Sequence, residues 1–369
     1  MRRAIFVAAT GQNVGKTTVC LGLISSLKKR VSSVGFLKPV GQEQIEVEEG
    51  AHVDKDVPLI KAHFGLPDPY EEMSPLLLPS HFTRDYLDGK ISVDSLKEKI
   101  LAAFQAIQQR HTVTVIEGTG HMGVGSIIDL NNAQVAALLG APILLVAPGG
   151  LGSTFDELAL NYSQCEKMRV PILGIVLNRV WEEKKEMIDT YMKKALKRWN
   201  LPLLGSIPYS SFLSAPTLFD FEQLFHTKLL TQAAKGMSHF HHIRLAASSV
   251  ETYRSEILPK QLIITPASRE EIILATLSKV WEYKIAEKGK ELDLAMILTG
   301  KPAPSDKIIE EIEKAGIPML YVPLSSSLIM KMIHSFTAKI RKGDSEKIEE
   351  AIQTVEKHLD LDRLLLCRS

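Results

Sequence analysis

The chain has 369 residues, more than the roughly 250 at which a single hydrophobic core stops growing, so we expect two domains. Its apolar content of 45% and charged content of 24% exclude a largely disordered chain, and its net charge of +1 excludes a general attraction to nucleic acid or to an anionic membrane. Three widely spaced cysteines and the lack of a membrane-spanning apolar run favour a cytoplasmic protein without disulfide bonds.

The first half of the chain alternates short apolar runs with helical patterns. This alternation predicts an α/β fold, a parallel sheet with helices on both faces. A helix is predicted at residues 17–29, while residues 42–79 form a Pro-rich, irregular connection that we interpret as substrate-facing loops. The predicted strands are residues 4–9, 34–40, 112–116, 141–147, 172–177 and 204–208.

The second half repeats the alternation on a smaller scale. Strands at 262–266, 294–298 and 319–322, with helices at 269–281 and 304–314, predict a smaller α/β domain. We place the first domain at residues 1–225 and the second at 226–369. A histidine-rich stretch is interpreted as a solvated face, because no acid or cysteine lies at metal-ligand spacing. It consists of His239, His241 and His242.

Residues 10–17 read Thr-Gly-Gln-Asn-Val-Gly-Lys-Thr and lie between a predicted strand and a predicted helix. A P-loop binds phosphate because main-chain N–H groups and a helix N-terminus surround the oxygens, while the lysine neutralises charge and the hydroxyl ligates Mg²⁺. Thr10 replaces the first glycine of the strict pattern, but the flanking strand and helix supply the required context. We therefore expect ATP and Mg²⁺ as cofactors. The expected nucleotide contacts are Gly11, Gln12, Asn13, Val14, Gly15, Lys16, Thr17 and Thr18.

Carboxylates near this loop are candidate metal ligands, because nucleotide-bound Mg²⁺ usually takes one or two of them. Glu117 follows a predicted strand and is delivered to the carboxyl edge of the sheet, beside the P-loop. Asp54 and Asp56 lie in the irregular connection, and either can reach the metal, although a loop aspartate is more often a turn former.

A glycine-rich segment, residues 118–126, follows Glu117 directly. So many glycines let the backbone approach an anion closely and form a second anion nest. His121 suits a base or phosphate ligand about as well as a hydrogen-bonded structural histidine. The expected nucleotide contacts in this segment are Gly118, Thr119, Gly120 and His121.

Lys38 ends the second predicted strand. A cation there is not buried unpaired, so we expect it to point at the same crevice, where an anion can pair with it. The alternative is a lysine whose stem lies along the strand end while its ammonium reaches solvent.

The order of these motifs, with Lys38-Pro39-Val40 and Leu177-Asn178-Arg179-Val180, resembles dethiobiotin synthetase and its P-loop relatives. The closer resemblance is to the N-terminal domain of long bacterial phosphotransacetylases with their attached DRTGG domain. Further segments that carry it are residues 52–56, 73–75, 82–86 and 207–209. The second domain resembles the DRTGG module through residues 264–274 and 297–300, with Ser268 in place of the aspartate.

This resemblance implies roles for individual residues. Thr17, Asp54 and Glu117 would hold Mg²⁺, and Asn178 would contact the nucleotide base. Lys16 and Lys38 would be catalytic, Lys38 by stabilising a carboxylate, carbamate or mixed anhydride. The resemblance also implies a small carboxylate or amine substrate and a homodimer. Because the chain ends at Ser369 without an acyltransferase domain, we expect no phosphotransacetylase activity.

Three functions remain open at this point. The first is a Mg²⁺-dependent ATP-binding protein with ATPase or ligase activity and a regulatory C-terminal module. The second is a nucleotide-sensing regulatory protein that binds ATP without turnover. The third is a true dethiobiotin synthetase. Gly41 and Gln42 argue against it, because that family usually has a small hydroxyl residue at this place.

Overall fold

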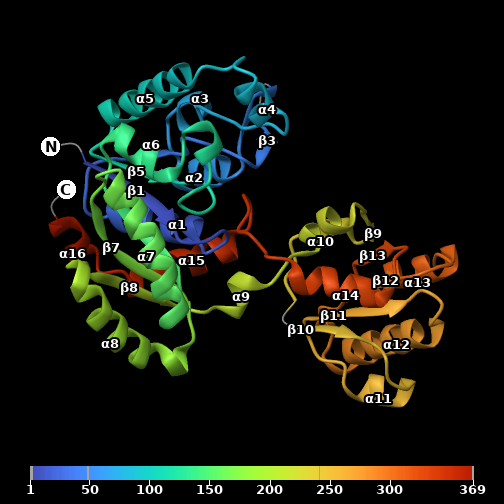
Figure 1. Cartoon of the computed structure of the whole chain (residues 1–369). Helices are drawn as coiled ribbons and strands as arrows, with labels where there is room; N and C mark the ends of the chain where they lie inside the picture. Colours follow the sequence, from blue (N-terminus) through green and yellow to red (C-terminus); the bar gives the residue numbers. More distant parts are fainter. Residues whose placement is uncertain (1–2, 48–49, 241, 368–369) are drawn as a thin grey trace. The chain divides into compact units, whose positions relative to one another are not determined.

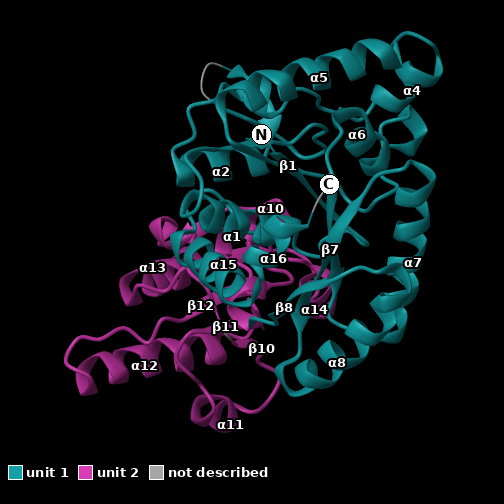
Figure 2. Cartoon of the chain, turned by 90° about the vertical axis from the view of Figure 1, so that its left-hand side faces the viewer, with its two compact units in different colours: residues 1–210, 340–369 teal, residues 211–339 magenta. Residues whose placement is uncertain are grey.

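The computed structural model describes residues 3–47, 50–240 and 242–367. The chain forms two compact units, shown in Figures 1 and 2. Unit 1 contains the described residues up to Ser210 together with those from Ile340 onward, and unit 2 is Ser211–Lys339. Within the described residues, no helix combines the length and the apolar character needed to cross a membrane.

Unit 1 is built on a six-stranded parallel sheet with the strand order β2-β5-β1-β6-β7-β8. The inner strands are almost wholly buried, as expected for apolar runs that are covered on both faces. All six predicted strands of this half are present, and the predicted α/β fold is confirmed. The strands are β1 (Arg3–Ala9), β2 (Val34–Leu37), β5 (Val113–Glu117), β6 (Ile143–Pro148), β7 (Ile172–Val180) and β8 (Leu203–Pro208).

The direction of the crossovers decides which face each helix covers. The connections from β2 through β5, β6 and β7 to β8 all advance in one direction, so right-handed crossovers place their helices on one face. The β1-to-β2 connection runs the opposite way and places α1 (Lys16–Lys28) on the other face, as Figure 2 shows. The helices on the first face are α5 (Val93–Arg110), α6 (Asn132–Leu139), α7 (Gly152–Lys167) and α8 (Lys185–Leu196).

The C-terminal segment covers the remainder of the α1 face, which corrects the expected second domain of residues 226–369. Helix α15 (Ser345–His358) packs along α1, where Ser25 Oγ donates to Glu356 at 2.7 Å. After it, the Asp360 N–H donates to the Leu204 carbonyl of β8 at 2.7 Å, and α16 (Leu361–Leu366) follows. The physical reason is that the local crossovers leave this face incomplete, so the apolar side of an amphipathic helix from the C-terminal segment covers it.

The connection at residues 42–79 is more regular than expected. It contains a small hairpin and two helices, and a third short helix follows it. The elements are β3 (Gln44–Glu46), β4 (His52–Asp54), α2 (Asp56–Phe64), α3 (Tyr70–Met73) and α4 (Phe82–Leu87). Short helices with few apolar positions carry little periodic signal, which explains why the sequence pattern did not indicate them.

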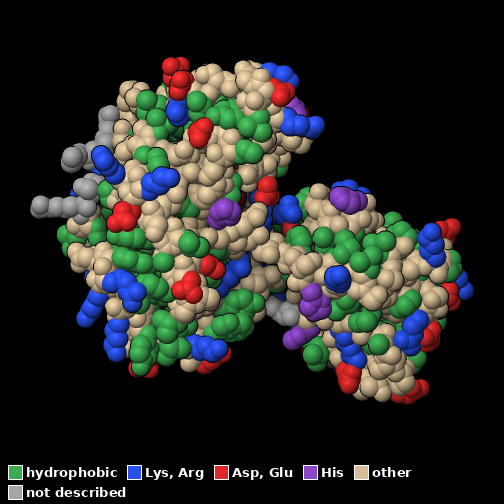
Figure 3. All heavy atoms as spheres, in the orientation of Figure 1, with side chains coloured by type: hydrophobic (Ala, Val, Ile, Leu, Met, Phe, Trp, Pro, Cys, Tyr) green, Lys and Arg blue, Asp and Glu red, His purple; other side chains and the backbone are tan. Residues whose placement is uncertain are grey.

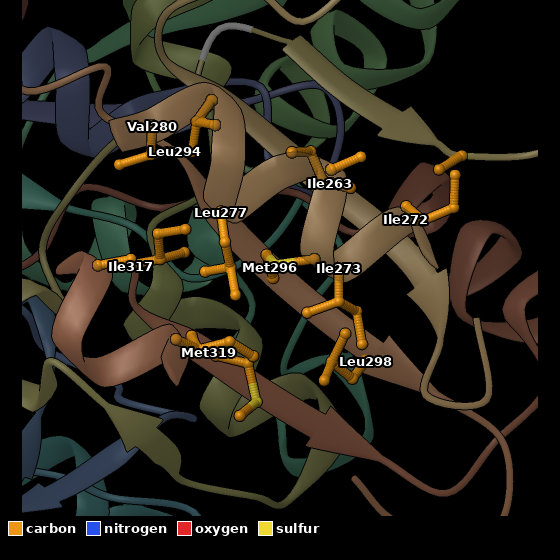
Figure 4. Close-up of a cluster of buried hydrophobic side chains, with 14 of the residues drawn as sticks. Ile263, Ile272, Ile273, Leu277, Val280, Leu294, Met296, Leu298, Ile317 and Met319 are labelled. Atoms are coloured by element: carbon orange, nitrogen blue, oxygen red, sulfur yellow. The ribbon is translucent and has the colours of Figure 1, made fainter. Parts of the chain in front are cut away.

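Unit 2 is a five-stranded sheet with the order β10-β11-β12-β13-β9, in which only β9 runs antiparallel. Figure 4 shows the core between α12 and the sheet, where Ile273 and Leu277 face Met296. A second core, which includes Phe221, joins α10 and α14 to the sheet, so α10 belongs to this unit rather than to the first domain. The elements are α9 (Ser211–Ser214), α10 (Leu218–Phe225), β9 (Leu229–Thr231), β10 (His242–Leu245), α11 (Val250–Ser255), β11 (Gln261–Pro266), α12 (Glu270–Ala286), β12 (Ala295–Thr299), α13 (Asp306–Ala315), β13 (Met319–Val322) and α14 (Ser326–Ser335).

The close contact between α1 and α15 gives a first prediction. A Cβ added at Gly22 would lie 2.2 Å from the Cβ of Val355, so we expect Gly22→Ala to overpack the interface and lower the free energy of unfolding by ~1–3 kcal/mol. The matched control is Gly152→Ala at the start of α7, where an added Cβ meets nothing within 4 Å, and we expect no loss of stability. Urea unfolding measures both, and equal effects of the two substitutions would contradict the packing.

Thiol reactivity gives a second prediction. Burial raises the pKa of Cys165 to about 12 and the pKa of Cys20 well above its usual value, so neither forms the reactive thiolate at pH 8. Cys367 is only half-buried. We expect the native chain to show one fast-reacting thiol with an aromatic disulfide reagent, which Cys367→Ser removes. Denatured protein should show all three thiols. A fast native phase of two or three thiols would contradict this assignment.

Candidate nucleotide-binding site

The loop between β1 and α1 has the backbone of an anion-binding turn. Asn13 and Gly15 adopt left-handed φ angles of 58° and 104°. Gly15 also requires glycine for space, because an added Cβ would lie 2.1 Å from the Nδ2 atom of Asn178. No side chain caps the N-terminus of α1, so its first N–H groups remain available to a phosphate.

Asn178 supports this loop from β7. Its Nδ2 donates to the Val14 carbonyl at 2.7 Å, and its Oδ1 accepts from the Arg179 N–H at 3.0 Å. The side chain is buried, and both ends of the amide are bonded to main chain. The structure therefore makes Asn178 a support of the P-loop. Its expected contact with a nucleotide base remains a prediction.

A buried cluster of charges lies at the carboxyl edge of the sheet. The Nζ of Lys38 lies 2.7 Å from Asp56 Oδ2 and 3.0 Å from Glu117 Oε1. Although burial alone would lower the pKa of Lys38, the carboxylates of Asp56 and Glu117 raise it well above its usual value. Lys38 is therefore a charged, paired cation, and its ammonium does not reach solvent.

The two carboxylates of this cluster differ in their titration. Burial raises the pKa of Glu117 to about 7, against the opposing attraction of Lys38. Burial disfavours the charged form of Asp56, but the charge and hydrogen bond of Lys38, together with the charge of Lys55 and a hydrogen bond with Glu117, lower its pKa to about 2. Asp56 is thus the permanent counter-ion of Lys38, and Glu117 is the group whose charge can change near neutral pH.

The first residues of α1 bond Glu117 and the segment that follows it. Thr17 Oγ1 donates to Glu117 Oε1 at 2.9 Å, and Lys16 Nζ donates to the Gly120 carbonyl. Burial, followed by the nearby charge of Lys38, lowers the pKa of Lys16. The second carboxylate oxygen of Glu117 is buried and has no hydrogen-bond partner. A hydroxyl beside a carboxylate with a free oxygen is a donor set that suits Mg²⁺.

Asp54 is held in a different way. Its Oδ2 accepts from the Gln42 N–H and its Oδ1 from the Asp56 N–H, both at 3.1 Å. Burial raises the pKa of this carboxyl. Across the described residues, no group of three or more His, Cys, Asp or Glu side chains is arranged as a metal site. The structure therefore brings Thr17 and Glu117 together, while Asp54 braces the turn that presents Asp56.

The glycine-rich segment after Glu117 is ordered by Asn132, a residue that the sequence analysis missed. Asn132 Oδ1 accepts from the Thr119 N–H at 2.9 Å, and its Nδ2 donates to the carbonyls of Thr119 and His121. An added Cβ at Gly118 would clash with Asn132 Oδ1 at 2.6 Å. The His121 ring is exposed and accepts from the Gly123 N–H at 3.1 Å, so it braces its own turn. The Asn131-Asn132 pair before an apolar helix was the available signal for this role.

The histidine-rich stretch belongs to unit 2. The His239 ring packs edge-on against Phe212 with centroids 5.0 Å apart, and His242 is exposed on β10. His241 lies outside the described residues. On the face shown in Figure 3, basic and acidic side chains are interspersed over both units.

Comparison with known proteins identifies the family to which the chain belongs. A model of the AAA domain matches residues 3–217, and a model of the DRTGG domain matches residues 223–336. The chain is 24% identical to a phosphate acetyltransferase of Nitratidesulfovibrio vulgaris, over 99% of this chain and 51% of the relative. It is 27% identical to that of Pseudomonas putida, over 97% of this chain and 51% of the relative. The chain thus spans about half the length of the curated relatives it matches.

Among solved structures, the chain is similar to the MinD cell division protein of Aquifex aeolicus. The identity is 14% and the TM-score 0.37, over 56% of this chain and 83% of that chain. A likeness this low adds nothing to the strand order described above. The predicted combination of a P-loop domain with a DRTGG domain, related to phosphotransacetylases, is confirmed by the family matches and the curated relatives.

The buried charge cluster gives a third prediction. Lys38→Ala leaves two buried carboxylates without their cation, so we expect the free energy of unfolding to fall by ~3–5 kcal/mol. The control is Lys90→Ala, whose exposed ammonium pairs with Asp85 and Asp88 and is expected to contribute little to stability. Urea unfolding compares the two variants. If both variants lose the same small part of the free energy of unfolding, Lys38 does not hold the cluster together.

Proposed function

Because this chain belongs to the AAA domain family, we propose that unit 1 binds ATP together with Mg²⁺ and that unit 2 is a regulatory module. The observation that carries the proposal is that Thr17, at the start of α1, bonds a buried carboxylate on β5, while the neighbouring Lys16 bonds the Gly120 carbonyl in the segment that follows β5. An anion-binding turn, a lysine and a hydroxyl beside a carboxylate are what a metal-bound triphosphate requires.

Each residue of the site has a defined part in this proposal. The main-chain N–H groups of residues 11–18 would receive the β-phosphate, and Lys16, which now bonds the Gly120 carbonyl, would neutralise phosphate charge. Thr17 and the free oxygen of Glu117 would hold Mg²⁺. When bound, Mg²⁺ would supply positive charge to the phosphoryl group that is transferred.

We favour Asp56 over Asp54 as the second carboxylate near the metal. Asp56 shares Lys38 with Glu117, so the two carboxylates already converge on one cation. Both oxygens of Asp54, in contrast, accept main-chain N–H groups. Asp54 then acts by holding the turn between Gln42 and Asp56 in place.

For the reaction itself, we propose ATPase or ligase-like phosphoryl transfer to a small carboxylate or amine substrate. Lys38 is suited to pair with an anionic substrate group, because its ammonium is charged and lies beside Glu117. Homodimer formation remains a prediction that follows from the resemblance to dethiobiotin synthetase.

A second candidate is a nucleotide sensor that binds ATP without turnover. It is supported by the engagement of Lys38 with two carboxylates, which occupies the Lys38 ammonium in this state. Phosphate release assays with candidate carboxylates and amines, including diaminononanoate with bicarbonate, separate the possibilities. Turnover that rises with one of these substrates supports the enzyme, while saturable ATP binding with flat, near-zero turnover supports the sensor.

The nucleotide site gives a fourth prediction, measured by thermal shift with ATP, ADP and GTP, with and without Mg²⁺. Ligand at a hundredfold excess over its Kd stabilises the folded state by ~2.7 kcal/mol, so ATP with Mg²⁺ should raise the Tm of the wild-type chain. Lys16→Ala should abolish this shift, while Lys90→Ala, an exposed lysine elsewhere in unit 1, should keep it. Identical melting of the wild-type chain under all conditions would overturn the proposal.

A further inference from the structure

Helix α12 of unit 2 carries apolar side chains on two of its sides. On the inner side, residues that include Ile273 and Leu277 pack against the sheet, as Figure 4 shows. On the outer side, Leu274 is 51% exposed, Trp281 43% exposed and Ile285 80% exposed. Burial of the inner side holds the helix on unit 2, so the outer apolar residues are not needed for this packing.

The outer residues lie along a single line of the helix, which we call the outer stripe. Its members follow one another at intervals of four, three and four residues, which brings each of them back to the same side of an α-helix. The stripe spans ~16.5 Å, at a rise of ~1.5 Å per residue. Single exposed apolar residues are common, but a line of them over three turns is typical of a surface on which another helix packs. The outer stripe consists of Leu274, Ser278, Trp281 and Ile285.

The outer stripe matches itself when the direction of the helix is reversed. Its midpoint falls between residues 279 and 280. About this midpoint, Leu274 lies opposite Ile285, and Ser278 lies opposite Trp281. Apolar residues thus face each other at both ends, and the small serine leaves room for the indole ring. A two-fold symmetric pair of identical helices needs this match, because each residue meets the reverse-order position of the other copy.

The charges at the ends of α12 favour the same arrangement. Glu270 and Glu271 lie in the first turn, whereas Lys284 lies in the last turn and Lys288 and Lys290 follow it. In an antiparallel pair, the acidic end of one helix lies beside the basic end of the other, and the opposed helix dipoles add to the attraction. A parallel pair would bring like charges together at both ends. A second copy of the chain supplies the complementary order of charges by symmetry.

We propose that two copies of this chain pair through the outer stripes of their α12 helices, antiparallel across a two-fold axis beside residues 279 and 280. The surface belongs to unit 2, and the pairing does not depend on nucleotide binding by unit 1. One pair of helices is at the small end of the size range of specific interfaces, so the pairing depends on concentration, with a Kd on the order of 10 µM.

Sedimentation equilibrium of the full chain, at concentrations from about one tenth of this Kd to about ten times it, measures the pairing. We expect Ile285→Glu to weaken it about tenfold or more, because a charge then enters an apolar contact. The matched control is Leu160→Glu, which changes an apolar residue on α7 of unit 1 that is 76% exposed, and it should leave the Kd within about twofold. A wild-type chain that stays monomeric, or an equal effect of the two substitutions, would overturn the pairing through α12.

Reversal of the end charges tests the antiparallel direction. One variant carries Glu270→Lys with Glu271→Lys, and the other carries Lys288→Glu with Lys290→Glu. Each variant alone should pair more weakly than the wild-type chain, because like charges then meet at both ends of the helix pair. An equimolar mixture should regain pairing, since the basic ends of one variant meet the acidic ends of the other. If the mixture pairs no better than the separate variants, the helices are not antiparallel.

Covalent capture tests the register. In a Cys367→Ser background, Leu274→Cys combined with Ile285→Cys places two thiols ~16.5 Å apart within one chain, too far for a disulfide bond between them. In the proposed pair, each of these thiols lies opposite the other kind on the second copy. Mild oxidation with diamide should therefore give a covalent dimer, seen by electrophoresis without reductant. Either single variant should give little dimer. No dimer from the combined variant, or as much from a single variant, would overturn the proposed register.

Discussion

The buried ammonium group of Lys38 holds together the elements beside the P-loop of unit 1. Lys38 comes from the end of β2, Asp56 from the first turn of α2 and Glu117 from the end of β5, so a single cation joins three elements. Buried ions are tolerated only when they are paired. The pairing therefore fixes where the β2–α2 connection lies over the sheet edge. It also holds the carboxylate on β5 beside the hydroxyl at the start of α1.

The return of the chain end to unit 1 gives this unit a second constraint. Because α15 packs along α1, the helix that begins with the P-loop lysine is held by residues more than three hundred positions later in the sequence. Unit 2 is consequently an insertion in unit 1, joined to it at Ser210 and again at Ile340. The second of these connections leads within a few residues to α15, the helix that packs along α1. A module at a free chain end would have only one connection.

The sequence predicted those features of the fold that depend on a local pattern of residues. The P-loop could be recognised because a strand, a glycine-containing turn and a helix occur in the required order within about thirty residues. The inner strands of both sheets were predicted because continuous apolar runs are their direct consequence. The presence of Lys38 and Glu117 at the carboxyl edge follows from the same reasoning, since both end parallel strands.

What the sequence did not predict depends on which distant surfaces meet. The amphipathic pattern of α15 shows that it needs a partner, but not that the partner is α1, and so the expected second domain ran to the chain end. The role of Asn178 was missed for a similar reason. The bond from its amide to the Val14 carbonyl joins residues far apart in the sequence, and no pattern of residue spacing indicates it. Asn132 and the short helices of residues 56–87 were missed because single hydrogen bonds and four- to nine-residue helices leave little periodic signal.

The charge cluster also shows how a ligase and a sensor can share one resting structure. In this state, Lys38 balances Asp56, and Glu117, with its pKa near 7, can be neutral or charged at little cost. A divalent cation at Glu117 and Asp56 would supply the positive charge that Lys38 now provides. Lys38 would then be free to face an anion outside the cluster without leaving a buried carboxylate unpaired. The two proposed functions would thus differ in whether an anionic substrate is present to pair with the Lys38 ammonium.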